Sequence, residues 1–203
     1  MRPLTDTTPK PLIQVFGKPL IEWQLEKLLA AGFTRIVINQ GWLGEQLPAA
    51  LGNGSRWGIE IVYSDETHLP GALETLGGIV KALPLLSPQG ESFAVVNGDI
   101  WTDFDYKQLE LAANEQANLI LVDNPSHNLS GDFDLLGEAL TFSGIAAYRP
   151  EMFAGLAPER AALGPFLRQK IAEGVVGAKH HQGRWMDIGT PQRLAELEAL
   201  LTG

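Results

Sequence analysis

Short apolar runs alternate with segments of helical periodicity over the first 123 residues of this 203-residue chain. The runs at 35–39, 59–63, 92–97 and 118–123 have the length of buried strands, and 19–32 carries leucines and isoleucine on one helical face. Alternation of this kind is typical of a sheet that is covered by helices on both faces. The sequence therefore predicts an α/β fold with a mostly parallel sheet.

The remaining predicted elements follow the pattern less regularly. Further helices are expected at 79–83, 105–116, 158–173 and 191–201. Further strands are expected at 140–148 and, as two short pieces, between 175 and 187, with a loop or short hairpin at 124–137. No repeat or linker interrupts the sequence, so a single domain over 1–203 is predicted.

Composition excludes several classes of function. A net charge of −9 argues against a general nucleic-acid binder, which needs a basic face. The absence of cysteine excludes disulfides, thiolate metal sites and cysteine nucleophiles. No signal-peptide pattern opens the chain and no apolar run approaches the ~20 residues of a membrane span. A cytoplasmic protein is the resulting expectation, and the oligomeric state is left open.

Two aspartates stand where an α/β sheet collects its ligands. Asp99 follows the apolar run of the third expected strand, and Asp187 stands shortly before a helix that begins at Pro191. The carboxyl ends of strands are the usual ligand-binding edge of such sheets, and Mg²⁺ takes carboxylate oxygens while keeping several waters. The pair predicts a magnesium–phosphate site. The alternative is that both are ordinary turn or N-cap aspartates.

A set of short motifs resembles one enzyme family, the sugar-1-phosphate nucleotidyltransferases. The motifs are Arg-Pro-Leu-Thr at 2–5, Pro-Lys-Pro-Leu at 9–12, Gly-Lys-Pro-Leu-Ile at 17–21, Asn-Gly-Asp at 97–99 and Trp-Met-Asp-Ile-Gly-Thr-Pro at 185–191. Within the family, the segments at 73–75, 97–103 and 140–145 are most similar to members that uridylylate N-acetylmuramate 1-phosphate in Gram-negative cell-wall recycling. The resemblance implies the Rossmann-like nucleotide-diphospho-sugar transferase fold.

The resemblance also implies a reaction. Such enzymes join a nucleoside triphosphate, here UTP, to a sugar 1-phosphate, here N-acetylmuramate 1-phosphate, and release pyrophosphate. Mg²⁺ is the implied cofactor, with Asp99 and Asp187 as its ligands. Lys10 matches the phosphate-binding lysine, so Lys10 and Asp99 are the implied catalytic residues. A mannose-1-phosphate guanylyltransferase is the alternative that the sequence leaves open.

The implied nucleotide-binding residues are Lys10, Asn39, Glu74, Gly77 and Gly78. Two prolines flank Lys10 and restrict its backbone, although a solvated surface lysine is the commoner fate of such a residue. The turn at 74–78 resembles a base-recognition turn whose glycines admit a base. Leu76 replaces a glycine there, which weakens the choice of nucleotide. A plain turn at a helix start, and for Asn39 a polar residue at a strand end, are the alternatives.

Ser143 and Gly144 match the position that faces the sugar in the family. The alternative for them is a strand residue beside a bulge. Asp132, within Gly-Asp-Phe at 131–133, could contact the sugar, but turn chemistry explains it equally well.

The family's N-terminal strand and its Gly-x-Gly-x-Arg loop do not appear in this sequence. Backbone amides of that loop cradle the triphosphate, and Arg2 is not assigned the role of its arginine. The chain is therefore expected to lack the first strand and to be N-terminally truncated, either through a misplaced start at Met1 or as a true truncation. Weak nucleotide binding and little turnover are expected of it.

Two other classes of protein compete with this interpretation. Asp103 and Asp105 form an Asp-x-Asp pattern that in many glycosyltransferases holds the metal of a sugar nucleotide, although Asp105 also fits a helix cap. A non-catalytic nucleotide-binding homologue is the second alternative, favoured by the absent loop and by Leu76. The retained Lys10 and the aspartate pair argue against it.

Overall fold

The computed structural model describes residues 1–68, 71 and 73–202. The chain forms two compact units, and both are discontinuous in sequence. The first unit comprises Met1–His68, Asn97–Lys107 and Gly183–Gly203, and the second comprises Leu69–Val96 and Gln108–Gln182. None of the helices in the described part of the chain has the length and apolar character that crossing a membrane requires.

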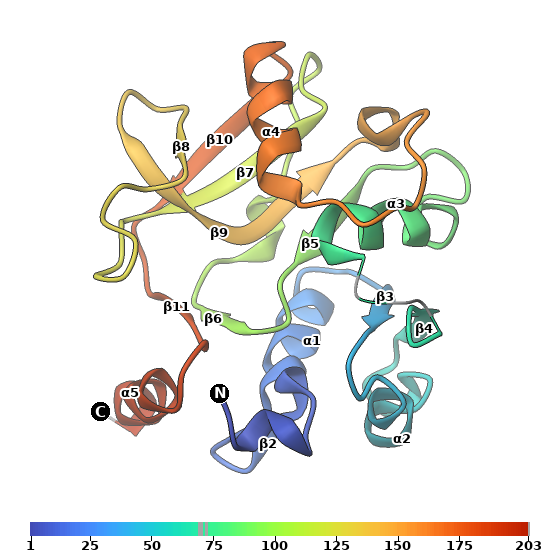
Figure 1. The fold of residues 1–203 in the computed structure, drawn as a ribbon, viewed down its shortest axis with the longest axis vertical. Helices are drawn as coiled ribbons and strands as arrows, with labels where there is room; N and C mark the ends of the chain where they lie inside the picture. The colour runs from blue at the N-terminus through green and yellow to red at the C-terminus, as the bar shows by residue number, and fades with distance from the viewer. Residues whose placement is uncertain (69–70, 72, 203) are drawn as a thin grey trace. The chain divides into compact units, whose positions relative to one another are not determined.

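The first unit contains three small pairs of strands and three helices (Figure 1). Its elements are β1 Gln14–Val15, β2 Lys18–Pro19, α1 Leu20–Ala30, β3 Arg35–Gln40, α2 Gln46–Leu51, β4 Glu60–Asp65, β6 Ile100–Thr102, β11 Trp185–Asp187 and α5 Pro191–Thr202. Strands β3 and β4 are parallel and are connected through α2, whereas β1 pairs with β2 and β6 with β11 in antiparallel fashion. The predicted strands at 35–39 and 59–63 and the helices at 19–32 and 191–201 are confirmed.

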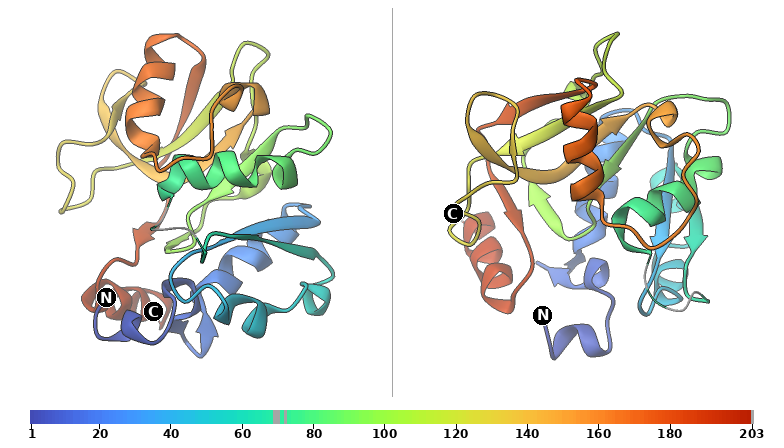
Figure 2. Two further views of the ribbon diagram at one scale, coloured as in Figure 1. Left: turned by 45° about the vertical axis from the view of Figure 1, so that its right-hand side comes forward. Right: turned by 45° about the horizontal axis from the view of Figure 1, so that its top comes forward.

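Two clusters of buried side chains stabilise the first unit. One joins α1 to the β3–β4 pair through residues such as Ile21, Leu25, Ile38 and Ile61. The other gathers the two ends of the chain and consists of Val15, Leu20, Trp101, Ile188 and Leu197, with Met1 and Leu201 packed against it. Figure 2 shows α5 beside the N-terminal turns. The second cluster matters most for function, because it holds β6 and β11 together.

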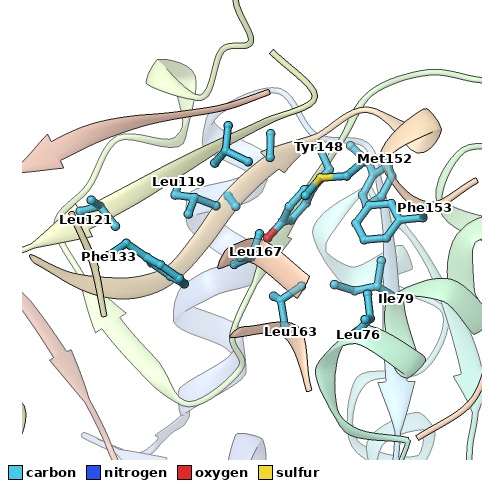
Figure 3. Packing of buried hydrophobic residues seen from close by; sticks show 14 of the residues in the cluster. Leu76, Ile79, Leu119, Leu121, Phe133, Tyr148, Met152, Phe153, Leu163 and Leu167 are labelled. Carbon is cyan, nitrogen blue, oxygen red and sulfur yellow. The ribbon is translucent and has the colours of Figure 1, made fainter. Parts of the chain in front are cut away.

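The second unit is a mixed sheet with two helices packed on it. Its elements are α3 Glu74–Leu86, β5 Phe93–Val96, β7 Ala117–Val122, β8 Phe133–Asp134, β9 Ala139–Tyr148, α4 Leu163–Ala172 and β10 Val176–His181. The strand order is β10-β7-β9-β5, and β8 pairs with β9. Its core is shown in Figure 3, where side chains from α3, α4, β7 and the segment after β9 point toward one another.

The prediction of a mostly parallel sheet is wrong for this chain. Strands β7 and β10 are parallel, but β9 lies between β7 and β5 and is antiparallel to both. The cause is the hairpin in which β8 pairs back onto the start of β9, so that the chain enters β9 without a crossover helix. The α/β class itself is confirmed.

The predicted helix at 105–116 is also wrong. Only a 3₁₀ turn, Tyr106–Gln108, forms there, and the rest of the segment is irregular. The backbone carbonyls of Ala112 and Glu115 accept hydrogen bonds from the Arg149 guanidinium at 3.3 and 2.8 Å, respectively. Because tertiary partners take these carbonyls, helical propensity does not decide the conformation.

Two helices have boundaries that differ from the predicted ones. Helix α3 begins at Glu74 rather than near 79 and continues through Pro84, which lies in its last turn. Helix α4 begins at Leu163 rather than 158, because the preceding segment is bonded to the start of α3. There the carbonyl of Ala161 accepts from the N–H of Leu76 at 3.1 Å and satisfies a donor that a helix start leaves open.

Candidate active site

Lys10 lies in a short 3₁₀ turn whose backbone is restricted by proline on both sides. The turn spans Lys10–Leu12, and the N–H of Leu12 donates to the carbonyl of Pro9 at 2.8 Å. The Lys10 ammonium donates to Asp99 Oδ2 at 2.5 Å, and the two side chains are 30% and 35% exposed. The turn thus directs a half-buried cation at the first of the two predicted metal ligands.

Asp99 lies immediately before β6, and its backbone is held by neighbouring segments. A Cβ added to the neighbouring Gly98 would stand 3.4 Å from Cγ of Pro11, so the segment that carries Asp99 packs against the Lys10 turn. The backbone carbonyl of Asp99 accepts from the N–H of Ile188 at 2.7 Å. This bond ties the backbone at Asp99 to the strand that carries the second aspartate.

Asp187 is the last residue of β11 and pairs in register with Ile100 of β6. Asp99 and Asp187, which are 88 residues apart in sequence, therefore arise at adjacent backbone positions of two paired strands. Asp187 Oδ2 accepts a hydrogen bond from Nη1 of Arg193. Both predicted metal carboxylates are thus paired with a cationic side chain.

A buried polar pair supports β6 from the side of α1. Gln24 Nε2 donates to the carbonyl of Ile100 at 2.7 Å, and the Tyr106 hydroxyl donates to Gln24 Oε1. The two side chains are only 3% and 2% exposed. Burial raises the pKa of the Tyr106 phenol well above its usual range, so the hydroxyl keeps its proton and remains a donor. The pair fixes the strand next to Asp99.

Sequence reasoning missed Arg193, Gln24 and Tyr106. Arg193 had a readable signal: it lies in the first turn of a helix that starts directly after the Asp187 turn, so the helix brings its side chain back toward that turn. Gln24 and Tyr106 had none, because their partnership joins positions 82 residues apart.

The donor set suits a hard divalent cation. Carboxylates from Asp99 and Asp187 are oxygen ligands of the kind that Mg²⁺ prefers, and Mg²⁺ is commonly bound by one or two carboxylates with waters and substrate phosphates. Among the residues that the structure describes, no cluster of three or more His, Cys, Asp or Glu side chains forms a closed metal cage. Asp99 and Asp187 are therefore candidate ligands for a cation that shares its coordination with phosphate.

Glu74, Gly77 and Gly78 belong to the second unit and form the first turns of α3. Glu74 has a positive φ of 59° and its carboxylate accepts from Arg160 Nε at 2.8 Å. A Cβ added to Gly77 would stand 2.1 Å from the carbonyl oxygen of Glu159, so this glycine is required by the chain's own backbone. Leu76 is 7% exposed and packs in the core, so its side chain does not project from the turn.

Ser143 and Gly144 form a bulge in β9, where the register with β7 shifts between Ile120 and Leu121. The Ser143 side chain is 1% exposed, and its hydroxyl donates to the carbonyl of Ile120 at 2.6 Å. Gly144 adopts a positive φ of 79°, which glycine accommodates without strain. Both residues of the bulge are buried, and the serine hydroxyl is bonded within the sheet.

Asp132 and Asn39 lie in different surroundings. The Asp132 carboxylate accepts from the N–H of Phe142 at 2.9 Å and from Asn128 at 3.2 Å, so both of its oxygens brace the loop before β9. Asn39 is an exposed residue near the end of β3, opposite Ser64 of β4. Asp132 thus braces a loop of the second unit, whereas Asn39 belongs to the first unit.

Comparison with curated proteins finds relatives along nearly the whole chain. An N-acetylmuramate alpha-1-phosphate uridylyltransferase from Neisseria meningitidis is 51% identical over 217 aligned residues, which cover 98% of this chain and 92% of the relative. One from Caulobacter vibrioides is 32% identical, covering 99% and 91%. A mannose-1-phosphate guanylyltransferase catalytic subunit from Drosophila melanogaster is 36% identical, but over 54% of this chain and 29% of its own length.

Solved structures show the same fold at lower identity. A putative glucose-1-phosphate thymidylyltransferase from Bacillus anthracis superposes with a TM-score of 0.79 at 18% identity, covering 98% of this chain and 89% of that one. HddC from Yersinia pseudotuberculosis gives a TM-score of 0.80 at 19% identity, with 96% and 91% covered. A family model for nucleotidyl transferases matches residues 1–131, which include Lys10 and Asp99. This chain therefore belongs to the nucleotidyl transferase family.

Proposed function

We propose that this protein transfers the uridylyl group of UTP to N-acetylmuramate 1-phosphate and releases pyrophosphate. The observation that carries the proposal is the ion pair of Lys10 with Asp99, together with the pairing of β6 with β11, which brings the backbones at Asp99 and Asp187 side by side. The two relatives above 30% identity that match nearly the full chain bear this activity in their names. We further propose that the reaction serves cell-wall recycling in the cytoplasm.

The reaction asks the protein mainly to position two anions that repel each other. An oxygen of the sugar phosphate attacks the α-phosphorus of UTP, a new P–O bond forms, and the bond to the pyrophosphate leaving group breaks in line with it. The attacking group is already an anion, so no general base is needed. The binding energy that orients the two substrates is the main contribution to rate.

Each residue of the site has a defined task in this scheme. Lys10 donates to phosphate oxygens on which negative charge develops, and its proline-restricted turn keeps the ammonium in place. Asp99 and Asp187 would hold Mg²⁺, which supplies charge neutralisation at the phosphates when bound. Gln24 and Tyr106 hold β6, and therefore Asp99, in register with β11.

The other residues expected from the sequence are also proposed as substrate contacts. Asn39, Glu74, Gly77 and Gly78 are the proposed nucleotide contacts, and the Gly144 backbone at the β9 bulge is the proposed sugar contact beside Ser143. Since the Ser143 hydroxyl is bonded within the sheet, it acts by shaping the bulge.

A substrate matrix tests the proposal. The purified protein is given UTP or GTP together with N-acetylmuramate 1-phosphate or mannose 1-phosphate, and nucleotide sugars are quantified by mass spectrometry. We expect kcat/KM for UTP with N-acetylmuramate 1-phosphate to exceed each other combination by roughly a hundredfold, as a polar pocket achieves against a mismatched substrate. GDP-mannose as the preferred product would overturn the assignment in favour of a guanylyltransferase.

A further inference from the structure

Arg193 forms an ion pair with Asp187, the second of the two aspartates. Its Nη1 donates to Asp187 Oδ2 and also lies 3.4 Å from the Asp187 carbonyl oxygen. The side chains of Arg193 and Asp187 are 23% and 28% exposed, respectively, so the pair is largely shielded from water. No role for Arg193 follows from the reaction scheme above.

The backbone between β11 and α5 places Arg193 beside Asp187. Thr190 caps α5, since its hydroxyl accepts from the N–H of Arg193 at 3.2 Å, and Pro191 occupies the first helical position. A Cβ added to Gly189 would stand 3.0 Å from Arg193 Nη2 and 3.1 Å from Asp187 Oδ2. A side chain at this position would crowd the ion pair, whose atoms would have to shift by a few tenths of an ångström. The contact therefore follows from the turn between β11 and α5.

The pair has a direct electrostatic consequence for a cation site. The oxygen that binds Arg193 is one of the oxygens through which Asp187 would coordinate Mg²⁺. A guanidinium and a divalent cation are both attracted to this carboxylate and repel each other at short range. Lys10 is likewise paired with Asp99, but its proposed role is to bind the substrate phosphates.

We propose that Arg193 is a positioning residue that competes with the divalent cation for Asp187 and thereby weakens cation binding to the free protein. A cation held by Asp187 would displace the guanidinium from this carboxylate, and a planar guanidinium suits a phosphate oxygen. Arg193 thus couples cation binding to the arrival of a phosphate-bearing substrate. The inference rests on the proposed function, because it uses Asp187 as a cation ligand.

Binding of Mn²⁺ to the full chain without nucleotide tests the inference separately from turnover. Free Mn²⁺ is measured by electron paramagnetic resonance during titration of the wild type, Arg193→Gln and Arg35→Gln. Arg35 pairs with Glu60 in the same unit at 3.1 Å and serves as the matched control for loss of an ion-paired arginine. We expect Arg193→Gln to bind Mn²⁺ roughly twofold to fivefold more tightly, as the loss of a partly exposed competing ion pair allows, and Arg35→Gln to bind as the wild type does.

Two further variants make every outcome informative. Arg193→Lys retains the charge but loses the planar guanidinium, so its Mn²⁺ affinity should lie between those of the wild type and Arg193→Gln. If thermal melting shows that Arg193→Gln does not fold, Arg193→Lys serves as the test. Unchanged or weaker Mn²⁺ binding in the folded Arg193 variants would overturn the inference. Asp187→Asn should lose Mn²⁺ binding, and wild-type affinity in that variant would instead count against Asp187 as a ligand, and so against the proposed function.

Discussion

Asp99→Asn is expected to lower kcat for nucleotide-sugar formation by about a thousandfold, because a metal ligand at a developing charge contributes several kcal/mol to the transition state. The substitution removes one negative charge and one ligand oxygen but keeps the shape of the side chain. It also leaves the Lys10 ammonium without its 2.5 Å carboxylate partner. The rate is measured under saturating UTP and sugar phosphate across a range of Mg²⁺ concentrations.

Two further variants serve as comparisons for Asp99→Asn. Asp187→Asn should show a loss of similar size, since the two aspartates arise at adjacent positions of β6 and β11. Asp134→Asn changes an exposed aspartate of β8 and should leave kcat unchanged. If Asp99→Asn, shown to be folded by its thermal transition, kept more than a tenth of the wild-type rate, the aspartate pair would not be the cation site.

Lys10→Gln is expected to lower kcat/KM for UTP by about a hundredfold, the size of effect seen when one donor to a developing oxyanion is removed. A glutamine amide can still hydrogen-bond to phosphate but carries no charge. Because the ammonium acts on the nucleotide phosphates, most of the loss should appear with UTP as the varied substrate. Initial rates at varied UTP and fixed sugar phosphate measure it.

Lys18→Gln is the matched control for this charge. Lys18 lies in the same unit, pairs with Glu26 at 2.7 Å and stands over the Trp23 ring, with no contact to either aspartate among the described residues. Its removal should leave kcat/KM within about twofold, as most surface charges do. Equal losses in the two lysine variants would indicate a general effect of charge and contradict a specific role for Lys10.

Local sequence pattern predicted those parts of the fold in which one element supplies its own signal. Helix α1 has an apolar face and lies between Pro19 and Gly32, and β3 and β4 are apolar runs bounded by turns. The start of α5 at Pro191 was equally readable, because threonine and proline mark a helix beginning. These elements appear where they were predicted.

The errors occurred where distant residues decide the local structure. The segment 105–116 has helical composition, but Arg149 takes two of its carbonyls and the helix does not form. The sheet is mixed because β8 turns back onto β9, and that pairing depends on a loop of irregular sequence. Neither interaction has a signature in the segment that it changes.

In the candidate site, too, some residues could be predicted from local sequence and others depend on distant contacts. Lys10, Asp99 and Asp187 could be proposed from motifs, and the structure joins them through one ion pair and one strand register. Gln24, Tyr106 and Arg193 support these residues through contacts that only folding creates. The sequence thus indicates which groups carry the chemistry, and the structure adds which groups hold them.

The turn at the start of α3 shows how one glycine can have two explanations. Its sequence predicted that Gly77 admits a base, with Leu76 as an obstacle. In the structure the Glu159 carbonyl occupies the space beside Gly77, and Leu76 is a core residue. The self-packing accounts for the glycine without a ligand, so a base contact at this turn stays a prediction.

The most direct test of the central claim is the fate of labelled phosphorus. The protein is incubated with N-acetylmuramate 1-phosphate and Mg²⁺ and with UTP labelled at either the α- or the γ-phosphate, and the products are separated by anion exchange. Attack at the α-phosphorus predicts α-label in a UDP-sugar and γ-label in pyrophosphate, in equal amounts, with both lost in Asp99→Asn. Consumption of UTP with γ-label recovered as inorganic phosphate, and with no α-label in a UDP-sugar, would contradict a uridylyl transfer at this site.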